Sequence, residues 1–391
     1  MSGFTTIADA CELVTDGTHY TPKDVGTGLP FLTVKDVSAS GLDFSGCSFI
    51  SESDYLVAKA GNSAPMQGDV LFSKDGTVGK VHVVSTDQPF AVLSSLAILR
   101  PTAGKVDPDY LGHVLRSPAV LDDALKKKTG SAIRRIVLGD LKRVRLPLPP
   151  LKEQRRIAAI LDQAETVRCQ RRAALAQLDS LTQSIFLDMF GDPVVNMKGL
   201  PVCFLGDLCT RITDGTHQSP KWEVAGIPFL FISNIVDGLI TFDTHKFIST
   251  ETHLELTRRC PIEIGDVLYT TVGSYGNAAI VDTSDRFAFQ RHIAHIKPDV
   301  TKANSIFIAA MIQSIGVRRQ VDKVAKGVAQ KTVNLADLKS LLVFAPPLPL
   351  QQTFATRIQA IESLKTTHRS ALAELDALFA SLQQRAFAGE L

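Results

Sequence analysis

The chain has 391 residues, of which 45% are hydrophobic and 21% charged, so we expect two or three globular domains with ordinary cores. No apolar run reaches the ~18 residues that span a bilayer, and the first residues lack the features of a signal peptide, which indicates a cytoplasmic protein. The formal net charge is only +2, so the total charge does not by itself indicate a nucleic-acid partner.

The sequence contains an internal repeat. Residues 15–22 (TDGTHYTP) recur as residues 213–220 (TDGTHQSP), and residues 68–72 (GDVLF) recur as residues 265–269 (GDVLY). The spacing is 198 residues for the first pair and 197 for the second, so the copies stay nearly in step along the chain. Such a duplication predicts two similar domains related by an approximate two-fold axis, which suits a two-fold target such as duplex DNA.

The globular part of each half is predicted to mix strands and short helices. In the first half, Gly- or Pro-bounded strands are expected at residues 31–34, 70–73, 80–84 and 91–99. One helix is expected to begin after Ser51, which has an acid three residues later, and another at Asp107-Pro108.

A long helix follows each globular part. After the prolines of residues 147–150, no Pro or Gly occurs from residue 151 to residue 189, and apolar residues recur at alternating steps of three and four. The predicted seam is Ile157, Ile160, Ala164, Val167, Ala174, Leu178, Leu181 and Ile185, interrupted by Arg171. The second copy supplies Phe354, Ile361, Leu364, Ala371, Leu375, Leu378 and Leu382, with His368 at the position of Arg171. This pattern predicts that the two helices pair as a coiled coil, with Arg171 and His368 as solvated or register-setting polar positions.

Charge is unevenly distributed along each half. Residues 121–145 hold eight Lys and Arg against three Asp, and residues 315–340 hold six against two. The same segment of both halves is therefore basic.

Motifs for catalysis and metal binding are not found. Residues 76–80 (GTVGK) lack the spacing and the Ser or Thr of a phosphate-binding loop. His292 and His295 lack the spacing of a metal pair and are interpreted as sheet-edge histidines. The D-x-K strings at residues 140–142 and 337–339 are more simply charged residues of short helices than half of a nuclease site. The six cysteines form no C-x-x-C pair, and we expect reduced, mostly buried thiols at positions 11, 47, 169, 203, 209 and 260.

Four strings resemble a known family, the specificity (S) subunits of type I restriction-modification systems. Residues 146–154 (LPLPPLKEQ) resemble the family's entry into its conserved helix, and residues 345–351 (APPLPLQ) are a looser second copy. Residues 184–193 (SIFLDMFGDP) resemble the central exit from that helix, and residues 381–391 resemble the C-terminal end. The strings occur in the family's order over almost the full length of the chain.

The resemblance implies an α+β fold with two similar mixed α/β target-recognition domains separated by two long antiparallel helices. The implied boundaries are 1–150 and 192–347 for the recognition domains, and 151–191 and 348–391 for the conserved helices. It also implies that double-stranded DNA with a bipartite target, two modification (M) subunits and, through them, restriction (R) subunits are the partners, with no membrane. The chain itself would be non-catalytic and hold no cofactor, since S-adenosylmethionine would belong to the M partner, and ATP and Mg to the R partner.

Two loops per half are candidates for DNA contact, because cations hold phosphates and amides, hydroxyls or guanidiniums read base edges. The first is a Gly-rich loop whose side chains differ between halves: Ser73, Lys74, Thr77 and Lys80 in the first, and Thr270, Ser274, Tyr275 and Asn277 in the second. The second is a basic loop with Lys128, Ser131, Arg134 and Arg135 in the first half, and Lys326, Gln330 and Lys331 in the second, where it resembles a G-x-x-Q-K loop of the family. Arg291 completes the candidate set. The alternatives are an ordinary hairpin connection for the first loop and a solvated loop for the second.

The near-identical residues 16–19 and 214–217 (DGTH) favour a structural turn or phosphate contact over sequence reading. Two other classes of protein stay open: a duplicated protein-binding scaffold without DNA specificity, and a fused methyltransferase, whose cofactor loop and N-P-P motif are absent.

Overall fold

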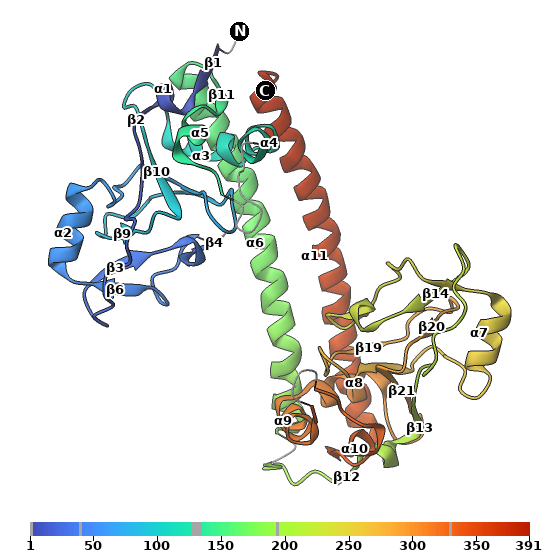
Figure 1. Ribbon diagram of the computed structural model, residues 1–391. Helices are drawn as coiled ribbons and strands as arrows, with labels where there is room; N and C mark the ends of the chain where they lie inside the picture. The colour runs from blue at the N-terminus through green and yellow to red at the C-terminus, as the bar shows by residue number, and fades with distance from the viewer. Residues whose placement is uncertain (1–2, 39–40, 127–134, 193–194, 328–330) are drawn as a thin grey trace. The chain divides into compact units, whose positions relative to one another are not determined.

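The chain divides into two compact units that share one topology. The computed structural model describes residues 3–38, 41–126, 135–192, 195–327 and 331–391. Unit 1 comprises residues 1–171 and 371–391, and unit 2 comprises residues 172–370 (Figure 1). Each unit contains one globular part and a segment of each of two long helices, α6 (Leu151–Phe190) and α11 (Leu348–Ala388).

The globular part of unit 1 is built on two small sheets. An antiparallel sheet has the order β2 (Cys11–Asp16), β10 (Leu96–Pro101), β7 (Val70–Ser73) and β8 (Val81–Val83). A second sheet has the order β6 (Ser48–Ile50), β3 (Leu29–Leu32) and β9 (Ala91–Val92), in which β3 and β9 are parallel. Two strand pairs complete the set: β1 (Gly3–Thr6) with β11 (Arg145–Leu148), and β4 (Val37–Ser38) with β5 (Gly41–Leu42). The helices are α1 (Ile7–Ala10), α2 (Glu52–Ala60), α3 (Pro108–Arg116), α4 (Pro118–Lys126), α5 (Leu138–Lys142) and a 3-10 turn η1 (Val34–Asp36).

Unit 2 repeats this topology strand for strand. Its antiparallel sheet is β13 (Cys209–Asp214), β21 (Ile293–Pro298), β18 (Val267–Thr270) and β19 (Ala278–Ile280), and its second sheet is β17 (Phe247–Ile248), β14 (Ile227–Leu230) and β20 (Ala288–Phe289). The pairs are β12 (Val202–Phe204) with β22 (Leu342–Phe344), and β15 (Ile235–Val236) with β16 (Leu239–Ile240). The helices are α7 (Thr250–Thr257), α8 (Ser305–Gln313), α9 (Ile315–Val324), α10 (Leu335–Lys339), η2 (Leu205–Leu208) and η3 (Ile232–Asn234). The prediction of two similar mixed α and β domains is confirmed.

Each four-stranded sheet is buried on both faces. Along β7, Val70 and Phe72 pack in the larger core of unit 1 with α3, α4 and the start of α6, whereas Leu71 packs in a smaller core on the opposite face. Unit 2 repeats this with Val267 and Tyr269 on one face and Leu268 on the other. Because successive side chains of a strand point to opposite faces, burial on both faces explains the continuous apolar runs in the sequence.

Local signals predicted the starts of two helices correctly. Ser51 caps α2, where its side chain accepts a hydrogen bond from the backbone N–H of Asp54, and Asp107 caps α3 through the N–H of Tyr110. Gly191 follows α6 with a φ of 81° and Gly389 follows α11 with a φ of 78°, a conformation that favours glycine. The predicted single strand at residues 91–99 is wrong, because a turn after β9 divides it into two strands that belong to different sheets.

The long helices run antiparallel to each other within each unit. In unit 1, Arg168 Nε donates to Asp376 Oδ1 at 2.7 Å and its guanidinium lies 4.3 Å from the centre of the Phe379 ring, while Arg156 bonds the backbone oxygen of Leu391. In unit 2, Lys365 Nζ lies 2.9 Å from Asp179 Oδ1. The predicted pairing of the helices is confirmed.

The predicted seam is correct at most positions of the two helices and one residue early at two positions of each. The predicted apolar positions Ile157, Ile160, Ala164, Ala174, Leu178 and Ile185 are at least partly buried, and Arg171 at the polar break is partly buried as well. Val167 and Leu181 are exposed, whereas the residues that follow them, Arg168 and Thr182, are partly buried. On α11, Leu364 and Leu378 are likewise exposed, and Lys365 and Phe379 take the inner positions. Among the described residues, none of the helices combines the length and apolarity that crossing a membrane requires.

Candidate nucleic-acid interface

The two candidate loops lie side by side in each unit. In unit 1, Asp75 of the Gly-rich loop forms an antiparallel bridge with Arg135 of the basic loop, and the N–H of Ile136 donates to the carbonyl of Lys74 at 2.9 Å. In unit 2, Val272 forms the same bridge with Thr332. The loops are far apart in sequence, so this contact joins them into one surface per unit.

Two of the candidate hydroxyls close the Gly-rich loop itself. Ser73 Oγ donates to the carbonyl of Thr77 at 2.6 Å and accepts from the N–H of Lys80 at 2.7 Å. Thr270 Oγ1 repeats both bonds in unit 2, with Ser274 at 2.8 Å and Asn277 at 3.0 Å. Ser73 and Thr270 are fully buried. These two side chains therefore hold the shape of the loop and are not available to a ligand.

Both lysines of the first Gly-rich loop are bound within the domain. Lys74 is 7% exposed, and its Nζ lies 3.3 Å from Asp16 Oδ2. Burial is the main cause that raises the pKa of the Asp16 carboxyl, and Lys74 opposes it. Lys80 Nζ donates to the carbonyls of Val34 at 3.0 Å and Val37 at 2.6 Å. A phosphate contact by either lysine would have to replace these bonds.

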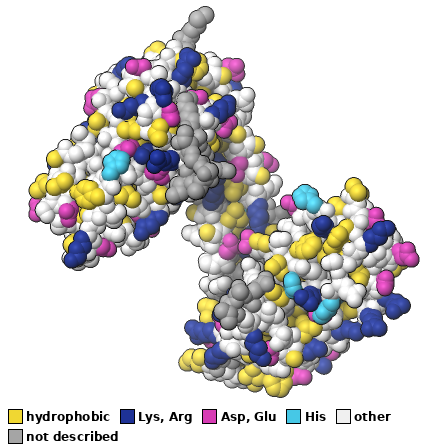
Figure 2. Space-filling view, in the orientation of Figure 1, with side chains coloured by type: hydrophobic (Ala, Val, Ile, Leu, Met, Phe, Trp, Pro, Cys, Tyr) yellow, Lys and Arg dark blue, Asp and Glu magenta, His cyan; other side chains and the backbone are white. Residues whose placement is uncertain are grey.

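The remaining described candidates are open to solvent on the joined loops or near them. Thr77, Ser274 and the four cations Arg135, Arg291, Lys326 and Lys331 are exposed, and Tyr275 and Asn277 are partly exposed. Lys128, Ser131, Arg134 and Gln330 lie outside the described residues. Figure 2 shows Lys and Arg side chains interspersed with Asp and Glu among the described residues on the visible face of both globular parts.

The structure adds a polar cluster that the sequence analysis missed. Tyr275 Oη donates to Asp322 Oδ1 at 2.8 Å, and the Arg318 guanidinium lies 4.7 Å from the centre of the Tyr275 ring. Arg318 and Asp322 are four residues apart on α9 (Ile315–Val324), a spacing that places them on one face of a helix. That spacing was the available signal, but the link to Tyr275 depends on the tertiary fold.

The repeated DGTH strings form a structural turn, as expected. A Cβ on Gly17 would lie 2.2 Å from the carbonyl oxygen of Val92, and one on Gly215 would lie 2.1 Å from that of Phe289. Only glycine allows this approach of the backbone, which explains why both copies keep it. Thr18 Oγ1 then closes the turn on the carbonyl of Tyr20 at 2.8 Å.

The interpretation of the histidines as sheet-edge residues is wrong for His295. His295 lies in β21, an inner strand of its sheet, is fully buried, and its Nε2 lies 2.6 Å from Asp266 Oδ2. In unit 1 the corresponding Asp69 instead receives two hydrogen bonds of 2.9 Å from Arg100. The short-helix interpretation of the two D-x-K strings is confirmed by α5 and α10.

The described residues offer few candidate groups for metal binding or for thiol chemistry. They contain no group of three or more His, Cys, Asp or Glu side chains that could hold a metal ion. None of the six cysteines forms a disulfide in the structure, and the expectation that most are buried is wrong, because only Cys11 and Cys47 are buried and Cys169 is exposed. Burial raises the pKa of Cys11 and of its repeat equivalent Cys209 to about 12.

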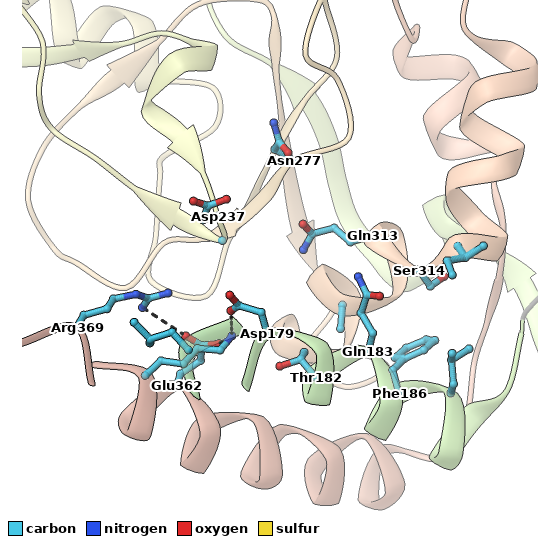
Figure 3. Close-up of a pocket in the computed structure, with 16 residues that line it drawn as sticks. Asp179, Thr182, Gln183, Phe186, Asp237, Asn277, Gln313, Ser314, Glu362 and Arg369 are labelled. Atoms are coloured by element: carbon cyan, nitrogen blue, oxygen red, sulfur yellow. Dashed lines mark hydrogen bonds and ion pairs between the residues drawn. The ribbon is translucent and has the colours of Figure 1, made fainter. Parts of the chain in front are cut away.

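A cavity of about 540 Å³ lies within unit 2, lined by α6, α8, α11 and the loops at Asp237 and Asn277 (Figure 3). Figure 3 shows Asp179, Glu362 and Arg369 at one end and Gln183, Gln313 and Ser314 at the other. Lys365 also lines the cavity, and its Nζ is 2.7 Å from Glu362 and 2.9 Å from Asp179. Since its cations face carboxylates, this cavity does not attract a polyanion, and the exposed joined loops remain the candidate interface.

Comparison with known proteins agrees with this arrangement. The protein-family model described as "Type I restriction modification DNA specificity domain" matches residues 4–176 and 197–377. The EcoBI specificity subunit of Escherichia coli is 22% identical, over 93% of this chain and 80% of that subunit. The putative MjaX specificity subunit of Methanocaldococcus jannaschii is also 22% identical, over 92% of this chain and 86% of that subunit.

Solved structures share the fold over the full length. The type I restriction-modification S subunit from M. genitalium has a TM-score of 0.56 at 15% identity, covering 99% of this chain and 96% of that one. A chain from a type I R-M system, solved to explain complex assembly and conformational transition, has a TM-score of 0.56 at 18% identity and covers 100% of this chain and 98% of that one. Because the family model matches both copies of the repeat and most of the chain, the protein belongs to the family of type I restriction-modification DNA specificity subunits.

Proposed function

We propose that this chain is the non-catalytic subunit that directs a type I restriction-modification complex to one bipartite DNA sequence. Each globular part reads one half of the site, the long helices bind two M subunits, and R subunits join through them. S-adenosylmethionine then belongs to the M partner, and ATP and Mg to the R partner. The complex acts in the cytoplasm, where chromosomal DNA is accessible.

One observation carries the proposal beyond family membership: both units join a Gly-rich loop to a basic loop on the same scaffold, with different side chains. The bridge between Asp75 and Arg135 in unit 1 has its counterpart between Val272 and Thr332 in unit 2. A shared scaffold gives both loops the same approach to a duplex, and different side chains allow each unit to prefer a different half-site.

Salt-dependent binding tests the proposal. The chain in complex with its M partner should bind duplex DNA with an affinity that falls steeply as salt rises, because lysines that neutralise phosphates release counterions. Lys331→Ala should weaken binding to all sequences and lower the slope of log affinity against log salt by about one. Lys59→Ala, which removes an exposed charge from the last turn of α2, serves as the charge-matched control and should leave the slope unchanged.

Two results would favour the rival functions. A protein-binding scaffold would show no salt-dependent DNA affinity, and a fused methyltransferase would bind S-adenosylmethionine or transfer methyl groups without the M partner. Exchange of residues 1–150 for another recognition domain offers a second test: only one half of the methylated motif should change. A change in both halves would contradict independent reading by the two units.

A further inference from the structure

One position beside the Gly-rich loop holds a cationic side chain in unit 2 and an apolar side chain in unit 1, although the glycine that faces it has nearly the same φ in both units. In unit 2, Gly276 has a φ of 95°, and a Cβ there would lie 1.8 Å from Arg318 Nη1. In unit 1, Gly79 has a φ of 97°, and a Cβ there would lie 2.5 Å from Leu121 Cδ1. Both glycines therefore make room for one side chain from the following helix, and that side chain is Arg in one unit and Leu in the other.

The residues that contact Arg318 in unit 2 also differ from those at the equivalent positions in unit 1. Tyr275 and Asp322 of unit 2 correspond to Val78 and Leu125 of unit 1 at the repeat spacing of 197 residues. Val78 packs against the larger core of unit 1, and within the polar trio of unit 2 Tyr275 packs against the core in the same way, whereas the Arg318 side chain is 42% and the Asp322 side chain 47% exposed. A half-exposed guanidinium and carboxylate add little to a core, so a packing role does not account for these two replacements.

Arg318 is held in one orientation by its neighbours. Its Nη1 donates to the carbonyl of Tyr275 at 2.9 Å, its Nε lies 3.4 Å from Asp322 Oδ1, and its guanidinium lies over the Tyr275 ring. A guanidinium has five N–H donors, so these contacts leave the Nη2 donors for a ligand, with no partner for them recorded in the part of the chain that the structure describes. Because the side chain is already held in one conformation before a ligand binds, less conformational entropy is lost on binding.

The cluster lies beside the candidate phosphate contacts. Its loop continues from Val272 and Gly273, which bond the strand-like segment at Lys331 and Thr332, and Lys331 is exposed. A duplex held by this lysine would bring base edges, which carry sequence information, close to the phosphates that it contacts.

We propose that Arg318 and Asp322 read one G·C base pair in the half-site recognised by unit 2, an inference that rests on the proposed function. Arg is the usual partner of the guanine O6 and N7 acceptors in the major groove, and a carboxylate accepts from the cytosine N4 amino group. An adjacent guanidinium and carboxylate match both members of this base pair, and Tyr275 positions them. The apolar trio of unit 1 cannot make these contacts.

The test uses the chain in complex with its M partner and duplexes that carry the methylated motif of the host, with each base pair substituted in turn. In the wild type, replacing one G·C pair should weaken binding about 10- to 100-fold. Arg318→Leu, the residue of unit 1, should bind the substituted and original duplexes equally, and the other half-site should be read as before. Arg319→Leu removes the neighbouring charge of α9, which is 67% exposed, and should keep the full preference.

Arg318→Lys separates base reading from phosphate contact while keeping the charge. Because an ammonium lacks the planar fork that Tyr275 and Asp322 hold in place, this variant should bind with a weaker G·C preference but keep the salt slope. Two results together would overturn the inference in favour of a phosphate contact. Arg318→Leu would bind all duplexes more weakly by the same factor and with a lower salt slope, and Arg318→Lys would keep the G·C preference. An unchanged preference in both variants would also overturn it, although sequence-specific binding by the wild type would leave the proposed function standing. Absence of sequence-specific binding by the wild type would instead refute the proposed function.

Discussion

Replacement of the buried glutamine at the start of each long helix should destabilise one unit at a time. Gln351 is fully buried, and its Oε1 accepts from the N–H of Asn304 at 2.9 Å while its Nε2 donates to the carbonyls of Lys302 at 3.0 Å and Pro346 at 2.8 Å. Gln154 makes the same three bonds in unit 1. The glutamine thus joins the start of α11 to the start of α8 in unit 2, and the start of α6 to the start of α3 in unit 1.

The size of the effect follows from the three backbone groups that lose their partner. A buried group left without a hydrogen bond costs about 1–3 kcal/mol, so with three such groups Gln351→Met should lower the free energy of unfolding by about 3–9 kcal/mol. For a unit of about 200 residues, each kcal/mol shifts the melting temperature by about 2–4 °C, which gives a decrease of roughly 6–36 °C.

Differential scanning calorimetry of the isolated chain provides the assay. Gln351→Met should move the transition of unit 2 and Gln154→Met that of unit 1, and Gln352→Met, which alters the exposed neighbouring residue, should move neither. Melting of Gln351→Met within a degree of the wild type, or an equal decrease in Gln352→Met, would refute the assigned role of the buried amide.

Three further outcomes are expected. Gly17→Ala should destabilise unit 1 by about 1–3 kcal/mol or more in denaturant unfolding, because its Cβ would lie 2.2 Å from a carbonyl oxygen. Gly46→Ala, whose Cβ would have nothing within 4 Å, should have little effect, and equal losses of stability in the two variants would contradict this. Burial acts to raise the pKa of the Asp266 carboxyl, but hydrogen bonds from His295 and Lys297 hold this pKa below its usual value. The ionised carboxylate should therefore stabilise the fold down to about pH 4, and this contribution to the free energy of unfolding should disappear as the pH falls further. Asp266→Asn should lack this acid-dependent part when unfolding is measured against pH. In thiol titration of the native chain at pH 8, exposed Cys169 should react first, and Cys11, with a pKa of about 12, should react only after unfolding; early reaction of Cys11 would show that unit 1 opens.

Features with a local cause were predictable from the sequence. Ser51 and Asp107 cap their helices through their own side chains, and Gly191 ends α6 because the chain adopts a positive φ there. The repeat also predicted that the two globular parts share a fold. The caps and the helix end depend on residues within a few positions of one another, whereas the repeat is visible by direct comparison of the two halves.

The errors have a tertiary cause. Ile160 and Leu161 are adjacent and both apolar, so periodicity alone could not select Leu161, which is fully buried, over Ile160. Further along, the inner positions hold Arg168 and Lys365, whose charges are paired across the helices, while apolar Val167 lies outside. A rule that assigns apolar residues to the seam therefore fails where an ion pair occupies it.

The candidate interface was predictable in parts but not as a whole. The Gly-rich and basic loops were both identified, yet their contact joins residues about 60 positions apart, such as Asp75 and Arg135. The buried roles of Ser73 and Thr270 were also hidden, because hydroxyls that close a loop look the same in a sequence as hydroxyls that face a ligand.

The composition of unit 1 constrains the order in which the chain can fold during synthesis. Its core contains Ala386, with Phe379, Leu382 and Phe387 packed against it, so residues 1–171 cannot complete their core until the final segment of α11 has been made. At translation rates of about 5–20 residues per second, the roughly 200 intervening residues delay that step by about 10–40 s. Unit 2, whose residues are contiguous, is complete first. The first domain to leave the ribosome is thus the last to finish folding, because the apolar face of α3 and α6 stays uncovered until the end of α11 has been made.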